Sequence, residues 1–214
     1  LLVDFKFPML QLKQLGNKPD LKLEVESRFL AEKDQLQISA LKIKKGLSYA
    51  VASGKILGNL EDAKFDKVLM NTRSYIDLEE VQLWLDTLAP GVEIPSMQGS
   101  LGFDVQSDID PNSKTVNSSY TLESKNVFVD NREVGDIQSQ GTFNSNSIQA
   151  THIRVNNSYT KATINDFKID NNTTAPFSGT VNIKSLQLYT LFRALQIGDI
   201  PVKTQLQGNI PCEG

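Results

Sequence analysis

The sequence predicts a mainly β protein: one elongated, strongly curved antiparallel sheet with two short amphipathic helices. Three observations carry this prediction. Apolar and polar residues alternate with period two along most of the chain. Short spacers rich in Asn, Ser and Asp separate the alternating runs. Only two segments show the spacing of a helix. Strands of this kind, joined by short polar turns, are typical of an antiparallel meander.

The alternating runs begin near Leu21 and continue almost to the end of the chain. Leu21, Leu23 and Val25 alternate with charged residues, which indicates a strand with one apolar face. The phase of the alternation slips by one residue between Ala40 and Leu41, and such a slip predicts a β-bulge or a bend.

Two segments break the strand period. Asp77 followed by Glu80 is a capping-box pattern, and the apolar residues from Leu78 to Leu88 fall at helical spacing before Pro90. The second segment runs from Ser185 to Leu195. Its apolar stripe consists of Leu188, Leu191, Phe192 and Leu195. We expect a short helix at each place.

The two helical segments also resemble each other. Each is followed by Ile-Pro, then by an alternating strand and a glycine, so residues 76–105 and 186–210 form a possible internal repeat. We therefore expect residues 1–214 to be a single elongated β segment. Because the chain has no initiator Met and no signal peptide at its start, we expect it to be part of a longer protein.

Composition argues against several functions. A net charge of -3 does not suit nucleic-acid binding, and no apolar run is long enough to span a bilayer. One His (His152) and one Cys (Cys212) cannot form a zinc cluster, and a Cys–His nucleophile pair would join residues far apart in the sequence. Glu79-Glu80 opens a helix, where acidic residues are favourable. We expect no enzyme activity, no metal and no cofactor.

A sheet with one apolar face must cover that face. A second sheet can do so, and a strongly curved sheet can fold the face inward as a groove. An aliphatic groove suits alkyl chains, although the same residues could simply form the core. The candidate groove residues are Met97, Leu101, Phe103, Val105, Tyr120, Leu122, Phe143, Ile153, Val155, Ile164, Val181 and Ile183.

Several stretches resemble the AsmA-like and TamB-like proteins of the Gram-negative envelope, which are repeating β-groove (β-taco) proteins. The likeness is one of style over most of the chain, without a fixed set of residues. It is carried by residues 38–46 with 54–60, residues 75–88 with 98–101, and the strand openings at 136–143 and 177–181.

The resemblance implies a periplasmic segment of a lipid-transfer bridge. Its groove would shield the acyl chains of phospholipids on their way between the inner and outer membranes. An inner-membrane anchor would lie outside this segment, and an outer-membrane assembly barrel would be a partner. The implied function is thus lipid transport and outer-membrane biogenesis. The two helices would cap or plug the groove.

Two further possibilities stay open. A non-catalytic structural or adhesive β domain of a secreted or cell-surface protein would have a closed core and no ligand. The glycosylation patterns at Asn117, Asn156, Asn171 and Asn172 would fit that location. A sheet edge that accepts a further strand could also assist envelope proteins, in addition to carrying lipid.

Overall fold

The computed structural model describes residues 2–12, 21–59, 61–62, 64–88, 94–171, 176–187 and 205–213. This part of the chain forms twelve strands and one helix. The helix is α1 (Leu78–Leu88). The strands are β1 (Leu2–Leu12), β2 (Leu21–Glu32), β3 (Gln35–Lys45), β4 (Ser48–Asn59), β5 (Lys64–Asp77), β6 (Met97–Asp110), β7 (Thr115–Val129), β8 (Arg132–Asn144), β9 (Ser147–Asn156), β10 (Thr160–Asp170), β11 (Phe177–Gln187) and β12 (Gln205–Glu213).

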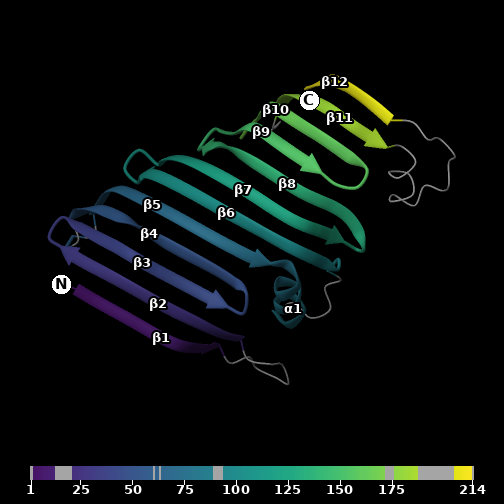
Figure 1. The fold of residues 1–214 in the computed structure, drawn as a ribbon. Coiled ribbons are helices and arrows are strands. Elements are labelled where there is room, and N and C mark those ends of the chain that lie inside the picture. Colours follow the sequence, from purple (N-terminus) through teal and green to yellow (C-terminus); the bar gives the residue numbers. More distant parts are fainter. Residues whose placement is uncertain are drawn as a thin grey trace. The chain divides into compact units, whose positions relative to one another are not determined.

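The strands form one open sheet in the order of the sequence, from β1 to β12 (Figure 1). Neighbouring strands pair antiparallel from β1 to β5 and from β8 to β12, as the alternation predicted. Among the described strands, proline occurs only in β1 (Pro8) and β12 (Pro211), the two edge strands. Edge strands are where proline is tolerated, because its missing N–H need not join the ladder.

The chain divides into two compact units. Unit 1 contains Leu1–Ile94 and Gly102–Ser119, and unit 2 contains Pro95–Leu101 and Tyr120–Gly214. Strands β6 and β7 therefore contribute to both units. The expectation of one elongated segment over residues 1–214 stays a prediction.

The bulge predicted in unit 1 is confirmed. Ile38 lies opposite Gly54, and Leu41 lies opposite Ala52, so β3 has one more residue than β4 between these pairs. The extra residue returns Leu41 to the face of Ile38, which is why the apolar alternation changes phase there.

The first predicted helix is confirmed and the second is wrong where it can be compared. The amide of Glu80 donates to Asp77 Oδ1 at 3.1 Å, which is the expected N-cap of α1. Of the second helix, Ser185–Gln187 instead end β11, where Leu186 lies opposite Thr160 of β10. Leu188, Leu191, Phe192 and Leu195 lie outside the described residues. Pairing with β10 thus extends the strand pattern past Ser185.

Few side chains are fully buried. In the described part of the chain, the buried hydrophobic residues are Ile38, Leu78, Val127 and Ala150. The buried polar residues are all serines: Ser27, Ser48, Ser118, Ser124 and Ser147. Most apolar strand residues are half-buried instead. No helix in the described ranges has the length and apolar character to span a membrane.

Candidate functional site

Five strands of unit 2 share an uninterrupted register, which we call the in-register block. It consists of residues 137–139 of β8, 153–155 of β9, 162–164 of β10, 181–183 of β11 and 208–210 of β12. Residues directly opposite one another in antiparallel strands point to the same face and have adjacent side chains. The block therefore arranges its side chains in straight rows that cross the strands.

Two of these rows make up the apolar face of the block. In the first row, Ser139, Ile153, Ile164, Val181 and Ile210 lie opposite one another in turn. The second row consists, strand by strand, of Ile137, Val155, Ala162, Ile183 and Gly208. In both rows the side chains on β8 to β11 are half-buried, and Ile210 on β12 is 49% exposed. The apolar face of the block is thus well aligned but incompletely covered.

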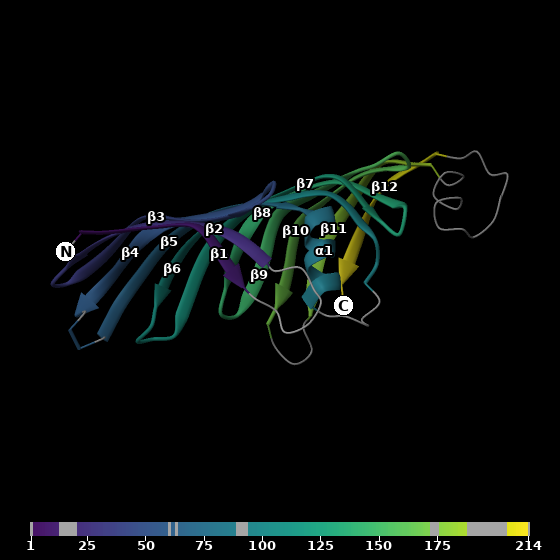
Figure 2. The ribbon, with the colours of Figure 1, turned by 90° about the horizontal axis from the view of Figure 1, so that it is seen from below.

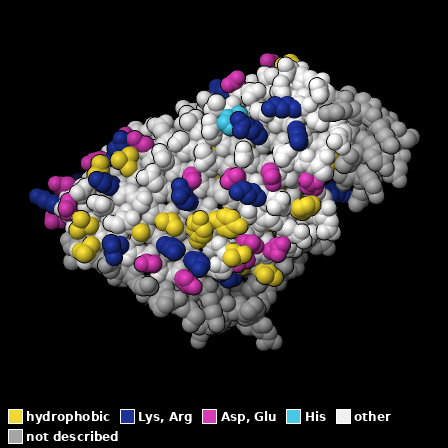
Figure 3. Space-filling model, viewed as in Figure 1, with side chains coloured by type: hydrophobic (Ala, Val, Ile, Leu, Met, Phe, Trp, Pro, Cys, Tyr) yellow, Lys and Arg dark blue, Asp and Glu magenta, His cyan; other side chains and the backbone are white. Residues whose placement is uncertain are grey.

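The row between them points to the opposite, polar face. It consists of Gln138, Arg154, Thr163, Asn182 and Asn209. In the face turned to the viewer in Figure 3, Lys, Arg, Asp and Glu side chains are interspersed among other side chains, backbone and several hydrophobic groups. Alternation by single residues thus separates an apolar face from a solvated one.

Register shifts bound the block on both sides. On one side, β9 carries an extra residue between His152 and Ala150, and β10 carries one between Asn165 and Lys168. Asp166 in this second bulge has a φ of 51°. On the other side, β11 carries an extra residue opposite the step from Lys161 to Ala162. Bulges bend strands and re-aim their side chains, so the two apolar rows form a distinct patch between bent segments.

A third apolar row, which we call the end row, crosses β8 to β11 beyond the bulges. Phe143 lies opposite Ile148, Ile148 opposite Ile169, and Ile169 opposite Phe177. Ile148 is 47% exposed and Phe177 is 41% exposed. This end of unit 2 therefore also presents uncovered apolar side chains.

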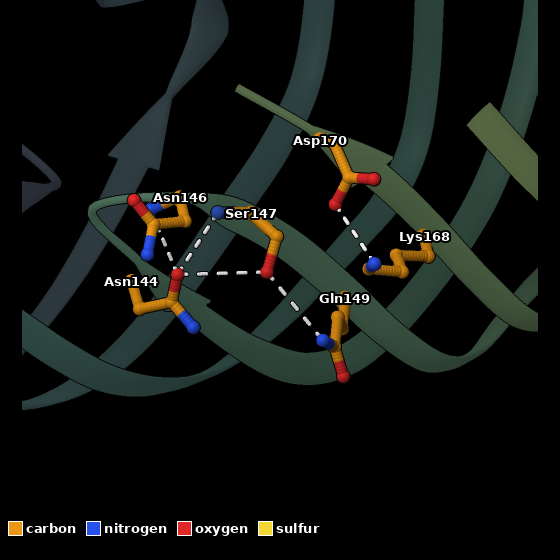
Figure 4. Close-up of polar contacts among 6 residues, drawn as sticks. All are labelled: Asn144, Asn146, Ser147, Gln149, Lys168 and Asp170. Atoms are coloured by element: carbon orange, nitrogen blue, oxygen red, sulfur yellow. Dashed lines mark hydrogen bonds and ion pairs between the residues drawn. The ribbon is translucent and has the colours of Figure 1, made fainter. Parts of the chain in front are cut away.

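Polar contacts lie at the end of the sheet next to that row (Figure 4). Asn144 Oδ1 accepts hydrogen bonds from the amides of Asn146 at 2.8 Å and Ser147 at 2.9 Å. Lys168 Nζ lies 2.9 Å from Asp170 Oδ1. The Asn144 contacts hold the β8–β9 turn, and the ion pair within β10, with side chains 46% and 38% exposed, contributes little to stability.

The twelve predicted groove residues are all half-buried. Five of them, Ile153, Val155, Ile164, Val181 and Ile183, come together in the in-register block. Phe143 belongs to the end row, and the hydroxyl of Tyr120 lies 3.3 Å from that of Ser139. Met97, Leu101 and Leu122 also belong to unit 2. Phe103 and Val105 belong to unit 1 and are not placed next to the block.

Sequence reasoning missed several members of the apolar rows. Ile137, Ala162 and Ile210 belong to the in-register block, and Ile169 belongs to the end row. Ile169 could have been predicted from a change of phase in the apolar alternation of this strand. Ile164 and Phe167 are three residues apart, whereas Phe167 and Ile169 are two apart. Ile210 gives no such signal, because only the register of β12 against β11 places it opposite Val181.

The two residues considered for nucleophilic catalysis lie on strands of unit 2 that are not neighbours. His152 lies on β9 and Cys212 on β12, with β10 and β11 between them. Three strand spacings correspond to about 14 Å. The described residues contain no group of three His, Cys, Asp or Glu side chains placed to hold a metal ion.

Charged groups in unit 1 form exposed ion pairs between β5 and β6 instead. Arg73 Nε donates to Asp104 Oδ1 at 2.7 Å, and Lys67 Nζ lies 2.9 Å from Asp108 Oδ2. The hydrogen bond to Asp104 and its charge raise the pKa of Arg73. Hydrogen bonds from the amide and hydroxyl of Ser113 lower the pKa of Asp110. These exposed carboxylates are engaged in turns and ion pairs.

Comparisons with known proteins found no protein-family model, no curated protein and no solved structure that matches the chain.

Proposed function

We propose that this segment binds the acyl chains of phospholipids on the apolar face of unit 2 and takes part in moving lipid through the cell envelope. The observation that carries the proposal is the row from Ile153 through Ile164 to Val181. It is in register across neighbouring strands and half-exposed. Covering such a face stabilises a complex by about 25 cal/mol per Å² of apolar surface.

The chemistry of the rows fits an alkyl ligand. Their larger side chains are Ile and Val, which offer dispersion contacts and no hydrogen-bonding group, apart from Ser139 at one end. The first row crosses five strands, which corresponds to about 19 Å. One leaflet of a bilayer has a hydrocarbon thickness of about 15 Å. A row of this length is therefore long enough for one acyl chain laid along it.

The resemblance to AsmA-like and TamB-like proteins extends the proposal to a place in the cell. In this proposal the segment lies in the periplasm and belongs to a strongly curved β-groove bridge anchored in the inner membrane. Phospholipid is the cargo, and an outer-membrane assembly barrel is the partner. A structural β domain with a closed core is the competing function. The small number of buried hydrophobic residues in the described part of the chain favours an open face.

Native mass spectrometry on the chain purified from bacterial envelope fractions without detergent tests the binding. The proposal expects phospholipid adducts on the folded monomer, and it expects them to disappear in Ile164→Glu but not in Thr163→Glu. A folded, lipid-free protein that also takes up no fluorescent fatty acid would refute lipid binding and support the structural alternative.

A further inference from the structure

Two strongly exposed leucines lie close to one contact in unit 1. Leu47 at the β3–β4 turn is 66% exposed, and Leu83 on α1 is 65% exposed. The amide of Leu47 donates to Glu80 Oε1 at 2.8 Å, and Leu83 follows Glu80 by three residues on the same helix. Residues three apart are neighbours on a helix surface. The two leucines thus flank the same carboxylate instead of being scattered over the surface.

This carboxylate fixes α1 to the β3–β4 turn. Glu80 Oε2 accepts hydrogen bonds from the amide of Ser48 at 3.0 Å and from its hydroxyl at 2.7 Å. Figure 2 shows that α1 is set to one side of the strands rather than within the sheet. The carboxylate also approaches the turn closely, because a Cβ at Gly46 would lie 1.8 Å from Glu80 Oε1. The leucines are therefore presented on a fixed arrangement of turn and helix.

Trp84 and Lys45 lie beside this contact. The ammonium of Lys45 lies 4.8 Å from the centre of the Trp84 ring. Trp and Lys are residues that combine an apolar body with a polar end, and both are favoured at the boundary between lipid headgroups and acyl chains. We call Leu47, Leu83, Trp84 and Lys45 the α1 tip.

The charges near the α1 tip show no positive excess. Glu26 lies opposite Lys42 and Glu24 opposite Lys44 on paired strands. Lys45 is close enough to Glu80 to favour its charged form. The first turn of α1 adds a second acidic residue, Glu79, and its last turn contains no basic residue. A surface with two exposed leucines, a half-buried Trp and no excess of positive charge is suited to a zwitterionic bilayer, because it offers no attraction to anionic headgroups.

We propose that the α1 tip docks on zwitterionic phospholipid bilayers by inserting Leu47, Leu83 and Trp84 among the headgroups. The inference deepens the proposed function, since a lipid carrier needs a place to exchange lipid with a membrane. The contact itself is independent of unit 2, because all four residues of the α1 tip belong to unit 1.

The single Trp of the chain, Trp84, provides the readout. The full chain is titrated with vesicles of pure phosphatidylcholine, and with vesicles containing phosphatidylglycerol, while Trp emission is recorded. Docking predicts a blue shift with phosphatidylcholine and no large gain with the anionic lipid. It also predicts that Leu47→Glu/Leu83→Glu weakens partitioning by about tenfold or more. No blue shift with the native chain would overturn the proposal, as would binding to anionic vesicles only.

The matched control is Phe65→Glu/Leu69→Glu, which places two glutamates on other exposed apolar residues of unit 1. This variant is expected to partition like the native chain, and equal weakening by both double variants would refute a specific tip. The single variant Leu83→Glu serves if the double variant does not fold. Fatty-acid binding by unit 2 is measured in parallel: Leu47→Glu/Leu83→Glu should keep it. Loss of docking with retained fatty-acid binding therefore separates this inference from the proposed function.

Discussion

Ile153 on β9 and Ile164 on β10 lie directly opposite each other, and both side chains are half-exposed. The same register places Val181 opposite Ile164 on the next strand. Each isoleucine is thus held between neighbouring strands and still presents part of its surface. This arrangement supports the proposal that the face binds an apolar ligand.

Replacing Ile164 with Glu should abolish fatty-acid binding while the protein stays folded. A carboxylate in the centre of the row would have to lose water beside an acyl chain. We expect the free energy of unfolding to fall by about 1–2 kcal/mol, because the site is only half-buried. Fluorescent fatty-acid titration and urea unfolding measure the two effects. Thr163→Glu, one residue away on the polar face, should change neither by much, and equal loss of binding in both variants would contradict the assignment of faces.

Ser124 should be essential for the stability of unit 2. Its side chain is almost fully buried, accepts a hydrogen bond from the Ile137 amide at 2.8 Å and donates to the Gly135 carbonyl at 3.5 Å. Ser124→Ala leaves the Ile137 amide without this acceptor, so we expect a loss of about 1–3 kcal/mol in urea unfolding. Ser119→Ala, at an exposed position of the same strand, should change stability by less than about 0.5 kcal/mol. A similar small effect at both serines would show that the contact is unimportant.

The attachment of α1 should weaken in acid. Burial alone would raise the pKa of Glu80, but hydrogen bonds from Leu47 and Ser48 and the charge of Lys45 outweigh it and lower the pKa. The group therefore stabilises the folded state above its unfolded pKa, near 4.5. This contribution is lost as the pH falls from that value through the lower pKa of the folded protein.

Glu80→Gln should remove this acid dependence and reduce stability at neutral pH by about 1–2 kcal/mol. Urea unfolding monitored by Trp84 fluorescence between pH 3 and pH 7 (about the range in which carboxylates titrate) tests both expectations. Glu79→Gln serves as the control, because Glu79 is exposed and adjacent. A native-like pH profile in Glu80→Gln would mean that another carboxylate is responsible.

Pro211 should protect an edge of the sheet from association. It lies opposite Thr180 in β12, the last strand of the order. Because proline supplies no N–H to a further strand, Pro211→Val should restore a donor and increase self-association. Analytical ultracentrifugation over a range of concentrations should show a new dimer or larger species. A variant that stays as monomeric as the native chain would indicate that other features of β12 prevent pairing.

The sequence predicted the strand pattern and the first helix well because both depend on local alternation and capping. The slip at Leu41 and the cap at Asp77 are examples, and both are found in the structure. The register between strands could not be predicted in this way. It depends on bulges such as the one at Asp166, where a non-glycine residue adopts a positive φ. The helix expected from Ser185 shows the same limit, since its first residues, Ser185 and Leu186, pair with β10 instead.

Site-specific photocrosslinking tests the lipid-binding face most directly. The photoreactive amino acid benzoylphenylalanine is placed at position 164 on the apolar face or at position 163 on the polar face, and the full chain is irradiated with phospholipid vesicles. We expect phospholipid adducts from position 164, and far fewer from position 163. Equal crosslinking at both positions, or none at position 164 in a folded protein, would contradict the claim that the apolar face of unit 2 binds acyl chains.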